Sequence, residues 1–348
     1  MTKSIDLLVL KENRKRRDNL LEIKLIKTME QPSIEQLLIE ANNYCIEHGQ
    51  ELKQSGEKTQ IFGLYNPKLC GIAVTREREE NSLEIVTFLV TADLEAEEVF
   101  LWYILKFNQH MYENILCSVD IDNKLMRQFG FDNNHSKTNK RQIDNPEEVI
   151  IRLENERDYD KTEELTREAF WNVYNPGCNE HYILHELRRK DTYLPELHYV
   201  AEYKGKVIGS IVYCKGKIVD DHSGVHEVIG FGPISVLPEY QRDGIGSMLI
   251  NRTINKAREM GFMAILICGN PDYYHRFGFK SASEYEITMS DGSSFDAFMA
   301  LELREGALGE LSGRYYEDDV FHSISDDQFQ LYDKKFAEKV MVKTPTQL

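Results

Sequence analysis

The stretch that most constrains the fold is residues 229–279 of this 348-residue chain. An apolar run there predicts a β-strand, which leads through a loop containing Gly244 and Gly246 into an amphipathic helix predicted over residues 247–260. A second apolar strand is predicted directly after that helix, over residues 262–268. The chain is therefore expected to fold around a strand, a glycine-containing loop, a helix and a second strand, as an α/β domain does.

The loop has the features of an anion-binding site. Gly244 and Gly246 can adopt backbone angles that other residues rarely reach, so several N–H groups can turn toward one point. The helix that begins there adds unpaired N–H groups and the positive end of its dipole. Two interpretations stay open on spacing alone: a phosphate-binding loop, and an ordinary turn between a strand and a helix that contains two glycines.

Two common phosphate-binding motifs do not fit. A Walker loop ends in Gly-Lys-Ser or Gly-Lys-Thr, and this loop has no such sequence. A dinucleotide fingerprint requires a small residue three positions after Gly246, where this chain has Leu249. A nucleotide-binding module is therefore disfavoured.

Two patterns in the stretch instead resemble those of the GNAT superfamily of acyl-CoA-dependent N-acyltransferases. The sequence Gln-x-x-Gly-x-Gly at residues 241–246 resembles motif A of that superfamily. Tyr274 precedes Gly-Phe at the spacing Tyr-x-x-x-Gly-Phe, which its members often carry. Residues 150–313 as a whole look like a GNAT domain of the bacterial type. The resemblance implies an α/β (α+β) fold with a mixed, mostly antiparallel central sheet flanked by helices, acetyl-CoA as co-substrate and no metal.

The resemblance also implies which residues bind acetyl-CoA. Backbone N–H groups of residues 242–246 would hold the pyrophosphate, with Arg242 adding positive charge. A backbone N–H on the preceding strand would polarise the thioester carbonyl, and Pro233 cannot supply it because proline has no N–H. The residues so implied are Ile234, Ser235, Val236, Gln241, Arg242, Asp243, Gly244, Ile245, Gly246, Asn270 and Tyr273, the last two beside the pantetheine arm. For Asn270, a plain Asn-Pro turn remains an equal alternative.

Two residues are predicted to move protons. Tyr274 is the candidate general acid for the leaving thiolate, since a phenol is an adequate acid toward an alkyl thiolate. A packed aromatic residue at a helix start is its alternative. Glu227, with the neighbouring His226, is the candidate base, because an alkylammonium group with a pKa of about 10.4 must lose a proton before it attacks. A solvated pair at a strand edge is the alternative there.

The resemblance assigns acceptor selection to the first two helices and the last strands of the domain. Trp171, Glu180 and His181 fall in the helical region and are candidates to bind an amine through aromatic and carboxylate groups. They can equally be helix surface. The resemblance thus implies that the acceptor is a primary amine, in a small molecule or a peptide. The sequence does not identify which amine it is.

The N-terminal half resembles a second copy of the same fold. When the chain is shifted by 148 positions, residues 126–131 fall on residues 274–279, and Phe-Gly-Phe matches without a gap. In that alignment, residues 241–246 fall on residues 93–98, which contain four carboxylates and no glycine and would repel a pyrophosphate. Met126, which has no proton to give, takes the place of the tyrosine. We therefore expect a degenerate, non-catalytic domain; coincidence between two unrelated α/β units is the alternative.

These patterns divide the chain into four parts. We expect an N-terminal arm over residues 1–19, a degenerate GNAT-like domain over 20–145, a catalytic GNAT N-acetyltransferase domain over 146–313 and a helical C-terminal extension over 314–348. The turn-rich sequence Asp-Asn-Pro marks the linker between the two domains.

Composition limits the partners and the compartment. The net charge of −16 disfavours nucleic acid and anionic membranes as partners and is compatible with a cationic amine. The six cysteines are scattered without metal-ligand spacing, and several lie in apolar runs, which predicts free thiols in a reducing cytoplasm. No secretory signal and no long apolar span is recognisable in the sequence. A homodimer stays open.

The sequence thus predicts an N-acetyltransferase that moves an acetyl group from acetyl-CoA to a primary amine by direct attack in a ternary complex. The alternative from another class is a protein that binds CoA or acyl-CoA without turnover, as a sensor or an interaction module. Tyr274 together with an intact glycine loop favours the enzyme, because a degenerate copy needs neither.

Overall fold

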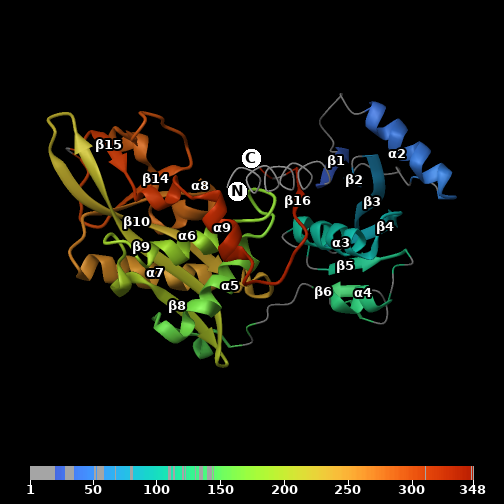
Figure 1. The fold of residues 1–348 in the computed structure, drawn as a ribbon, viewed down its shortest axis with the longest axis horizontal. Coiled ribbons are helices and arrows are strands. Elements are labelled where there is room, and N and C mark those ends of the chain that lie inside the picture. Colours follow the sequence, from blue (N-terminus) through green and yellow to red (C-terminus); the bar gives the residue numbers. More distant parts are fainter. Residues whose placement is uncertain are drawn as a thin grey trace, which may run out of the picture. The chain divides into compact units, whose positions relative to one another are not determined.

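The computed structural model divides the chain into two compact units, each built on its own β-sheet (Figure 1). The first unit takes in residues 1–140, 171–177 and 339–348, and the second takes in residues 141–170 and 178–338. The predicted arm over residues 1–19 lies outside the described residues. The structure describes residues 20–27, 35–50, 52, 59–66, 68–78, 81–108, 111–112, 114–119, 121, 123–129, 131–132, 136–138, 143, 145–309, 311–345 and 347.

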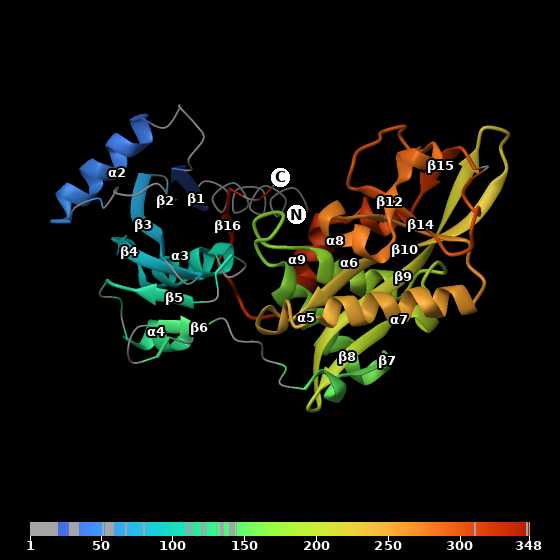
Figure 2. The same ribbon diagram turned by 180° about the vertical axis from the view of Figure 1, so that it is seen from behind.

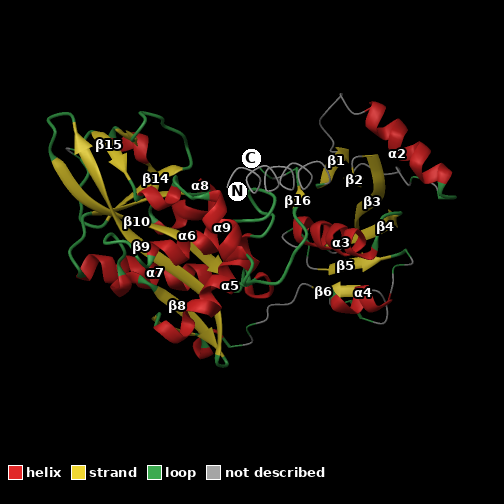
Figure 3. Cartoon of the chain, in the orientation of Figure 1, coloured by secondary structure: helices red, strands yellow, loops and turns green. Residues whose placement is uncertain are grey.

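The second unit is a mixed sheet flanked by helices (Figure 3). The strands follow the order β12-β14-β11-β10-β9-β15-β13; β8 also pairs with β9 and carries β7 on its other edge. The pairs β10–β11 and β13–β15 are parallel and the other described pairs are antiparallel. Its strands are β7 (Ile150–Leu153), β8 (Tyr199–Tyr203), β9 (Lys206–Asp220), β10 (Val225–Val236), β11 (Ala264–Cys268), β12 (Lys280–Ser281), β13 (Ile287–Met289), β14 (Phe298–Glu302) and β15 (Gly313–Tyr316). Its helices are α5 (Tyr159–Phe170), α6 (Glu180–Leu187), α7 (Ile245–Glu259), α8 (Pro271–Tyr274) and α9 (Asp326–Asp333).

Different helices cover the two faces of this sheet. Side chains alternate along β9, so Tyr213 points to the face that packs α7, where its hydroxyl lies 2.9 Å from Thr253 Oγ1. Cys214 points the other way and packs against apolar residues of α6. Figure 1 shows α6 in front of the strands, and Figure 2, the view from behind, shows α7 in front of them. We refer to these as the α6 face and the α7 face.

The first unit repeats this succession of strands. From β1 to β6 its pairs are antiparallel, antiparallel, antiparallel, parallel and antiparallel, as they are from β7 through β8, β9, β10 and β11 to β14. The prediction of two α/β units with mixed, mostly antiparallel sheets is therefore confirmed. Among the described helices, none combines the length and the apolar character needed to cross a membrane. The elements are β1 (Leu21–Lys27), α2 (Glu35–Glu47), β2 (Thr59–Asn66), β3 (Lys68–Arg78), β4 (Ser82–Val90), α3 (Leu94–Asn108), β5 (Asn114–Cys117), α4 (Asn123–Gln128), β6 (Ser136–Thr138) and β16 (Val342–Lys343).

The residue-by-residue match predicted for the glycine loop is wrong in the first unit. There β4 and α3 are separated only by residues 91–93, whereas residues 237–244 separate β10 from α7. Residues 95–98 are therefore already helical, and Asp93 Oδ1 accepts a hydrogen bond from Ala96 N at 2.9 Å as a helix cap does. The first unit has a shorter connection instead of an acidic version of the loop.

The predicted C-terminal helical extension also needs correction. Helix α9 forms, but Gly313–Tyr316 is strand β15, which pairs with β9 and β13 of the second sheet. Strand β16 pairs with β1 of the first sheet. Gly216 and Gly230 make room for β15, because a Cβ at either position would lie 2.7 or 2.8 Å from the Tyr315 ring or hydroxyl. The packing of Tyr315 over Gly216 and Gly230 joins three segments that are distant in the sequence. The four residues of β15 alone could therefore not predict it.

Helix α9 is held to α5 and α6 by one carboxylate. Asp333 accepts hydrogen bonds from Arg167 Nε at 2.8 Å and from His181 Nε2 at 2.9 Å, and both donors are almost fully buried. Burial alone would raise the pKa of Asp333, but the hydrogen bonds from His181 and Arg167 outweigh it and hold this pKa below its usual value. The C-terminal helix is thus tied down by a buried ionic contact.

Replacing Asp333 with Asn should loosen α6. The change removes the carboxylate that pairs with the buried Arg167, and we expect protection of α6 amides from hydrogen exchange to fall by about 2–3 kcal/mol at pH 7. Because the folded pKa is lowered, the stabilisation is present above the unfolded pKa, about 3.9, and is lost as pH falls through the folded pKa. The difference between variant and wild type should therefore vanish in acid. Asp327→Asn, at an exposed position of α9, is the control, and equal protection in the two variants would contradict this account.

Candidate active site

The glycine loop adopts the conformation of an anion cradle. Arg242 and Gly244 both have left-handed backbone angles, with φ of +72° and +87°, and α7 begins at the next residue, Ile245. This alternation turns backbone N–H groups toward one side, next to the positive end of a helix. A Cβ placed on Gly244 would meet no atom within 4 Å, so the space in front of the loop is open. These are the features of a loop that can bind an anion.

Two residues of the predicted loop hold its shape. Gln241 donates from Nε2 to the carbonyl of Val236 at 3.1 Å and so ties the loop to the end of β10. Asp243 accepts a hydrogen bond at Oδ2 from the backbone N–H of Ile143 at 3.0 Å. Their side chains are engaged in these contacts, and Arg242 between them is exposed.

Helix α8 brings two more predicted residues beside the loop. Tyr273 lies over Gly246, where an added Cβ would be 2.7 Å from the tyrosine hydroxyl. The Arg276 guanidinium lies 4.8 Å from the centre of the Tyr273 ring and brings a second positive charge to this region. Asn270 caps α8 and accepts a hydrogen bond at Oδ1 from Asp272 N at 2.9 Å, which is the Asn-Pro turn left open above. No pattern in the sequence pointed to Arg276.

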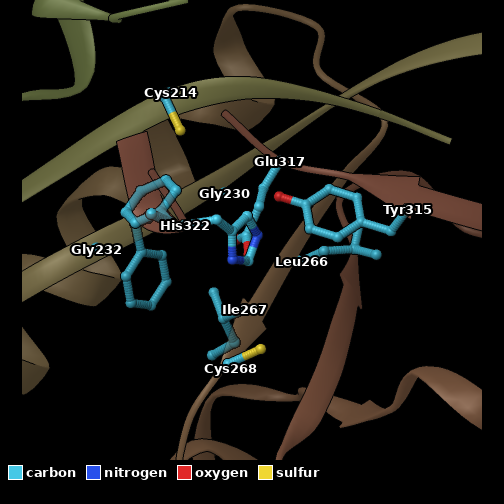
Figure 4. Close-up of a pocket in the computed structure, with 11 residues that line it drawn as sticks. Cys214, Gly230, Gly232, Leu266, Ile267, Cys268, Tyr315, Glu317 and His322 are labelled. Carbon is cyan, nitrogen blue, oxygen red and sulfur yellow. The ribbon is translucent and has the colours of Figure 1, made fainter. Parts of the chain in front are cut away.

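The central strands of the second sheet separate next to this loop. The parallel pairing of β10 with β11 covers only Ile229 with Ile265 and Gly230 with Leu266, while β10 stays paired with β9 as far as Val236. A register shift between Phe231 and Ile234 marks the start of the separation. A cavity of about 240 Å³ lies there (Figure 4). Its lining residues are Cys214, Gly230, Phe231, Gly232, Leu266, Ile267, Cys268, Tyr315, Glu317, Phe321 and His322.

Both faces of the sheet contribute to this cavity. Phe231 and Ile267 belong to the apolar cluster of the α7 face, whereas Cys214 and Phe321 belong to that of the α6 face. The cavity where β10 and β11 separate is therefore bordered by residues of both faces. Ile234, Ser235 and Val236 form the β10 border of the opening, and the Ser235 hydroxyl donates to Thr166 Oγ1 at 3.0 Å.

Tyr274 lies one aromatic ring away from the cavity. Its ring centre is 5.9 Å from that of Phe231, which lines the cavity, and 5.7 Å from that of Phe279. The side chain is 9% exposed and packs into the α7-face core. Gly269 permits this position, because a Cβ there would be 2.2 Å from Tyr274 Cε2. The structure thus places Tyr274 on the same face as the glycine loop.

The two thiols that line the cavity are neutral near pH 7. Burial raises the pKa of Cys214 and of Cys268 to about 12, so neither thiol is a ready nucleophile. Burial also raises the pKa of Glu317, and the nearby His322 counteracts this in part. Glu317 and His322 are cavity residues that the sequence analysis missed, since they follow a short strand that carries no recognised motif.

The other predicted proton-moving and acceptor residues lie elsewhere. Glu227 is outside the cavity lining; its side chain is 57% exposed and pairs with Lys215 at 3.0 Å. His181 is fully buried against Asp333. Trp171 clusters with the first unit, where its indole Nε1 donates to Val340 O at 2.9 Å. Glu180 accepts a hydrogen bond from Asn179 N, and burial raises its pKa.

No cluster of His, Cys, Asp and Glu that fits a metal ion occurs in the part of the chain that the structure describes. None of the six cysteines, each of which is described, forms a disulfide, as the sequence predicted.

The known proteins to which this chain is similar are acetyltransferases by name. Residues 161–279 match the acetyltransferase (GNAT) family. Over 171 residues the chain is 26% identical to "Uncharacterized N-acetyltransferase YhbS" of Escherichia coli strain K12, which covers 49% of this chain and 97% of that protein. It is 33% identical over 87 residues to "Uncharacterized N-acetyltransferase YjhQ" of the same strain, which covers 25% of this chain and 47% of that protein.

Two solved structures show the same kind of similarity. The structure of YhbS from Escherichia coli in complex with CoA has 24% identity and a TM-score of 0.46, and covers 51% of this chain and 94% of its own. A GNAT family acetyltransferase from Brucella melitensis in complex with acetyl-CoA has 27% identity and a TM-score of 0.41, and covers 50% of this chain and 97% of its own.

The class of protein follows from the family match and the curated relatives: it is an acyltransferase. The family match assigns residues 161–279 to the GNAT superfamily, and this segment lies in the second unit apart from residues 171–177.

Replacing Gly269 with Ala tests the position of the Tyr274 ring. The added Cβ would overlap the ring, which is packed on several sides, and we expect the second unit to lose about 1–3 kcal/mol of unfolding free energy in urea. Gly309→Ala is the control, since its Cβ would meet only Gly306 O, at an ordinary 3.6 Å. A Gly269→Ala protein as stable as the control would show that the ring lies elsewhere.

Proposed function

We propose that the second unit transfers an acetyl group from acetyl-CoA to a primary amine. The observation that carries this proposal is the glycine loop, with left-handed Arg242 and Gly244, beside the separation of β10 from β11. The loop offers N–H groups to a diphosphate, and the opening offers a passage from the loop side of the sheet to the cavity. A thioester extending from the diphosphate along the β10 edge would reach that cavity.

Transfer by direct attack fits the cavity better than a covalent enzyme intermediate does. A covalent route needs an activated nucleophile, and the thiols of Cys214 and Cys268 are held in their neutral form by burial. With no activated thiol in the lining, the amine itself would attack the thioester. Backbone N–H groups of residues 234–236 are the proposed donors to the oxyanion that develops.

Tyr274 is the proposed general acid for the CoA thiolate. It lies on the face that carries the glycine loop, and its ring contacts Phe231 at the cavity wall. Glycine at position 269 keeps that side of the ring free of a Cβ. The short connection of the first unit and Met126, buried in α4, support a non-catalytic role for that unit.

A protein that binds CoA without turnover remains the second candidate. The intact loop alone suits both functions, whereas the conjunction of loop, opening and Tyr274 is needed only for transfer. The match to a family of acyltransferases fits an enzyme whose acceptor is a primary amine in a small molecule or a peptide. Six free thiols fit a reducing cytoplasm.

Binding of acetyl-CoA should depend on Gly244. At a hundred times its dissociation constant, acetyl-CoA should stabilise the wild-type chain by about 2.7 kcal/mol, measured as a thermal shift. Gly244→Glu places a charged side chain in the open space before the loop and should abolish that shift. Gly205→Glu is the matched control, because Gly205 also has a left-handed φ, +79°, and open surroundings, but lies in the β8–β9 turn. An unchanged shift in the Gly244 variant would sink the loop assignment.

Replacing Tyr274 with Phe should separate chemistry from binding. The ring stays and only the acidic hydroxyl is lost, so the acetyl-CoA thermal shift should persist while kcat falls by a factor on the order of 10² to 10⁴. A purely structural tyrosine would instead lose about 1 kcal/mol of stability and keep its rate. Thiol release in the presence of an amine panel is the measurement, and wild-type turnover in this variant would remove Tyr274 from the mechanism.

A further inference from the structure

One ionisable pair in the cavity has no role in the function proposed so far. Glu317, just after β15, and His322, just after the 3₁₀ turn Asp319–Phe321, both line the cavity (Figure 4). Glu317 Oε1 and His322 Nε2 are 2.9 Å apart. The glutamate side chain is 19% exposed and the histidine 58%, so the carboxylate lies inside and the imidazole reaches solvent.

We propose that Glu317 accepts the proton of the acceptor ammonium group and that His322 passes it to solvent. The acceptor is then a primary alkylammonium group that enters the cavity from the α6 face. This inference rests on the acetyl transfer proposed above and names its base and its substrate class.

The two faces of the sheet carry the two kinds of proton transfer that the reaction needs. Glu317 lies close enough to Cys214 and Cys268 that its charge raises the pKa of both thiols, and Cys214 packs on the α6 face. Tyr274 lies on the α7 face with the glycine loop. An acid beside the leaving thiolate and a base beside the incoming amine thus sit on opposite sides of the opening between β10 and β11.

The lining selects a cation. The lining residues within the described chain include no Lys or Arg, and a carboxylate is the one acidic side chain among them. Three aromatic side chains, Phe231, Tyr315 and Phe321, also line the cavity, and aromatic rings attract ammonium groups. The same apolar surroundings disfavour the charged form of an amine, which lowers its pKa and makes its proton easier to remove.

The protons balance over the reaction. Glu317 takes one proton from R–NH₃⁺, and the resulting amine attacks the thioester carbon, which forms the C–N bond. Collapse of the tetrahedral intermediate breaks the C–S bond, and Tyr274 protonates the thiolate. The nitrogen, which began with three protons and ends with one in the amide, loses its second proton to the Tyr274 phenolate and so restores the phenol. The net release is one proton, the one that leaves through Glu317 and His322.

The groups around Glu317 determine how this base titrates. Tyr315 of β15, Cys214 of β9 and Cys268 of β11 surround it, with Asp318 and His322 on its own segment. Burial raises the pKa of Glu317 most, Asp318 raises it further, and His322 lowers it. Lys190 of the α6 end pairs with Asp318 at 3.8 Å and Asp319 at 2.6 Å. A raised pKa brings the carboxylate closer to the pH at which it must act.

The test compares four variants of the full chain: Glu317→Gln, His322→Gln, Glu227→Gln and the control Glu259→Gln, at an exposed position at the end of α7. The acceptor is whichever of butylamine, cadaverine, spermidine and lysine amide gives the fastest thiol release from acetyl-CoA with wild type. Glu317→Gln should lower kcat/KM by about 10² to 10⁴ and keep the acetyl-CoA thermal shift. His322→Gln removes the group that lowers the Glu317 pKa, so the acid limb of kcat/KM should move to higher pH.

Three outcomes overturn the inference. Wild-type kcat/KM in Glu317→Gln, or a loss found in Glu227→Gln in its place, removes Glu317 as the base. An acid limb that does not move in His322→Gln removes the relay. A wild-type chain that binds acetyl-CoA but releases no thiol with any of the amines refutes the transferase function itself, and therefore also the base. In the other outcomes the wild type still turns over, so failure of the base is distinguished from failure of the transferase function.

Discussion

The site depends on the separation of two parallel strands in the middle of a sheet. Buried N–H and C=O groups normally need partners, and so a sheet rarely opens at its centre. Here β10 keeps its antiparallel pairing with β9 up to Val236, and β11 keeps its pairing with β14 through Cys268. Each strand is held from its outer side, which lets their shared edge open beyond Gly230 without loss of the sheet. The cavity, the glycine loop and Tyr274 are all arranged around this opening.

Charge is distributed across the opening in a way that suits acyl transfer. The α7 face presents the positive end of α7, Arg242 and Arg276, which match an anionic co-substrate. The cavity contains neutral thiols, aromatic rings and a single acidic residue, Glu317, which match a cationic acceptor. In the proposed function, two substrates of opposite charge would therefore approach opposite sides of one sheet.

The C-terminal part of the second unit completes the cavity. Tyr315 fits over Gly216 and Gly230, which fixes β15 on the sheet and carries Glu317 to the cavity two residues later. Asp333 ties α9 to the buried Arg167 and His181. Residues that looked like a helical tail in sequence are thus part of the sheet and of the site.

The sequence by itself determined the α/β class, the repeated unit, the glycine loop before α7 and Tyr274 after β11. These signals are local, because a helix period, a strand run and a motif spacing each need only neighbouring residues. It also led to Glu227 as the base and to Trp171 and His181 as acceptor residues, since position relative to a motif was the only guide. The tertiary structure alone decided that Glu227 pairs with Lys215 at the surface, that His181 is buried against Asp333, and that Glu317 and His322 reach the cavity. The physical reason is that the contact of His181 with Asp333 and the lining of the cavity join segments far apart in the chain, while the Glu227–Lys215 pair is set by the register of β9 against β10. No local pattern in the sequence specifies such packing across the sheet.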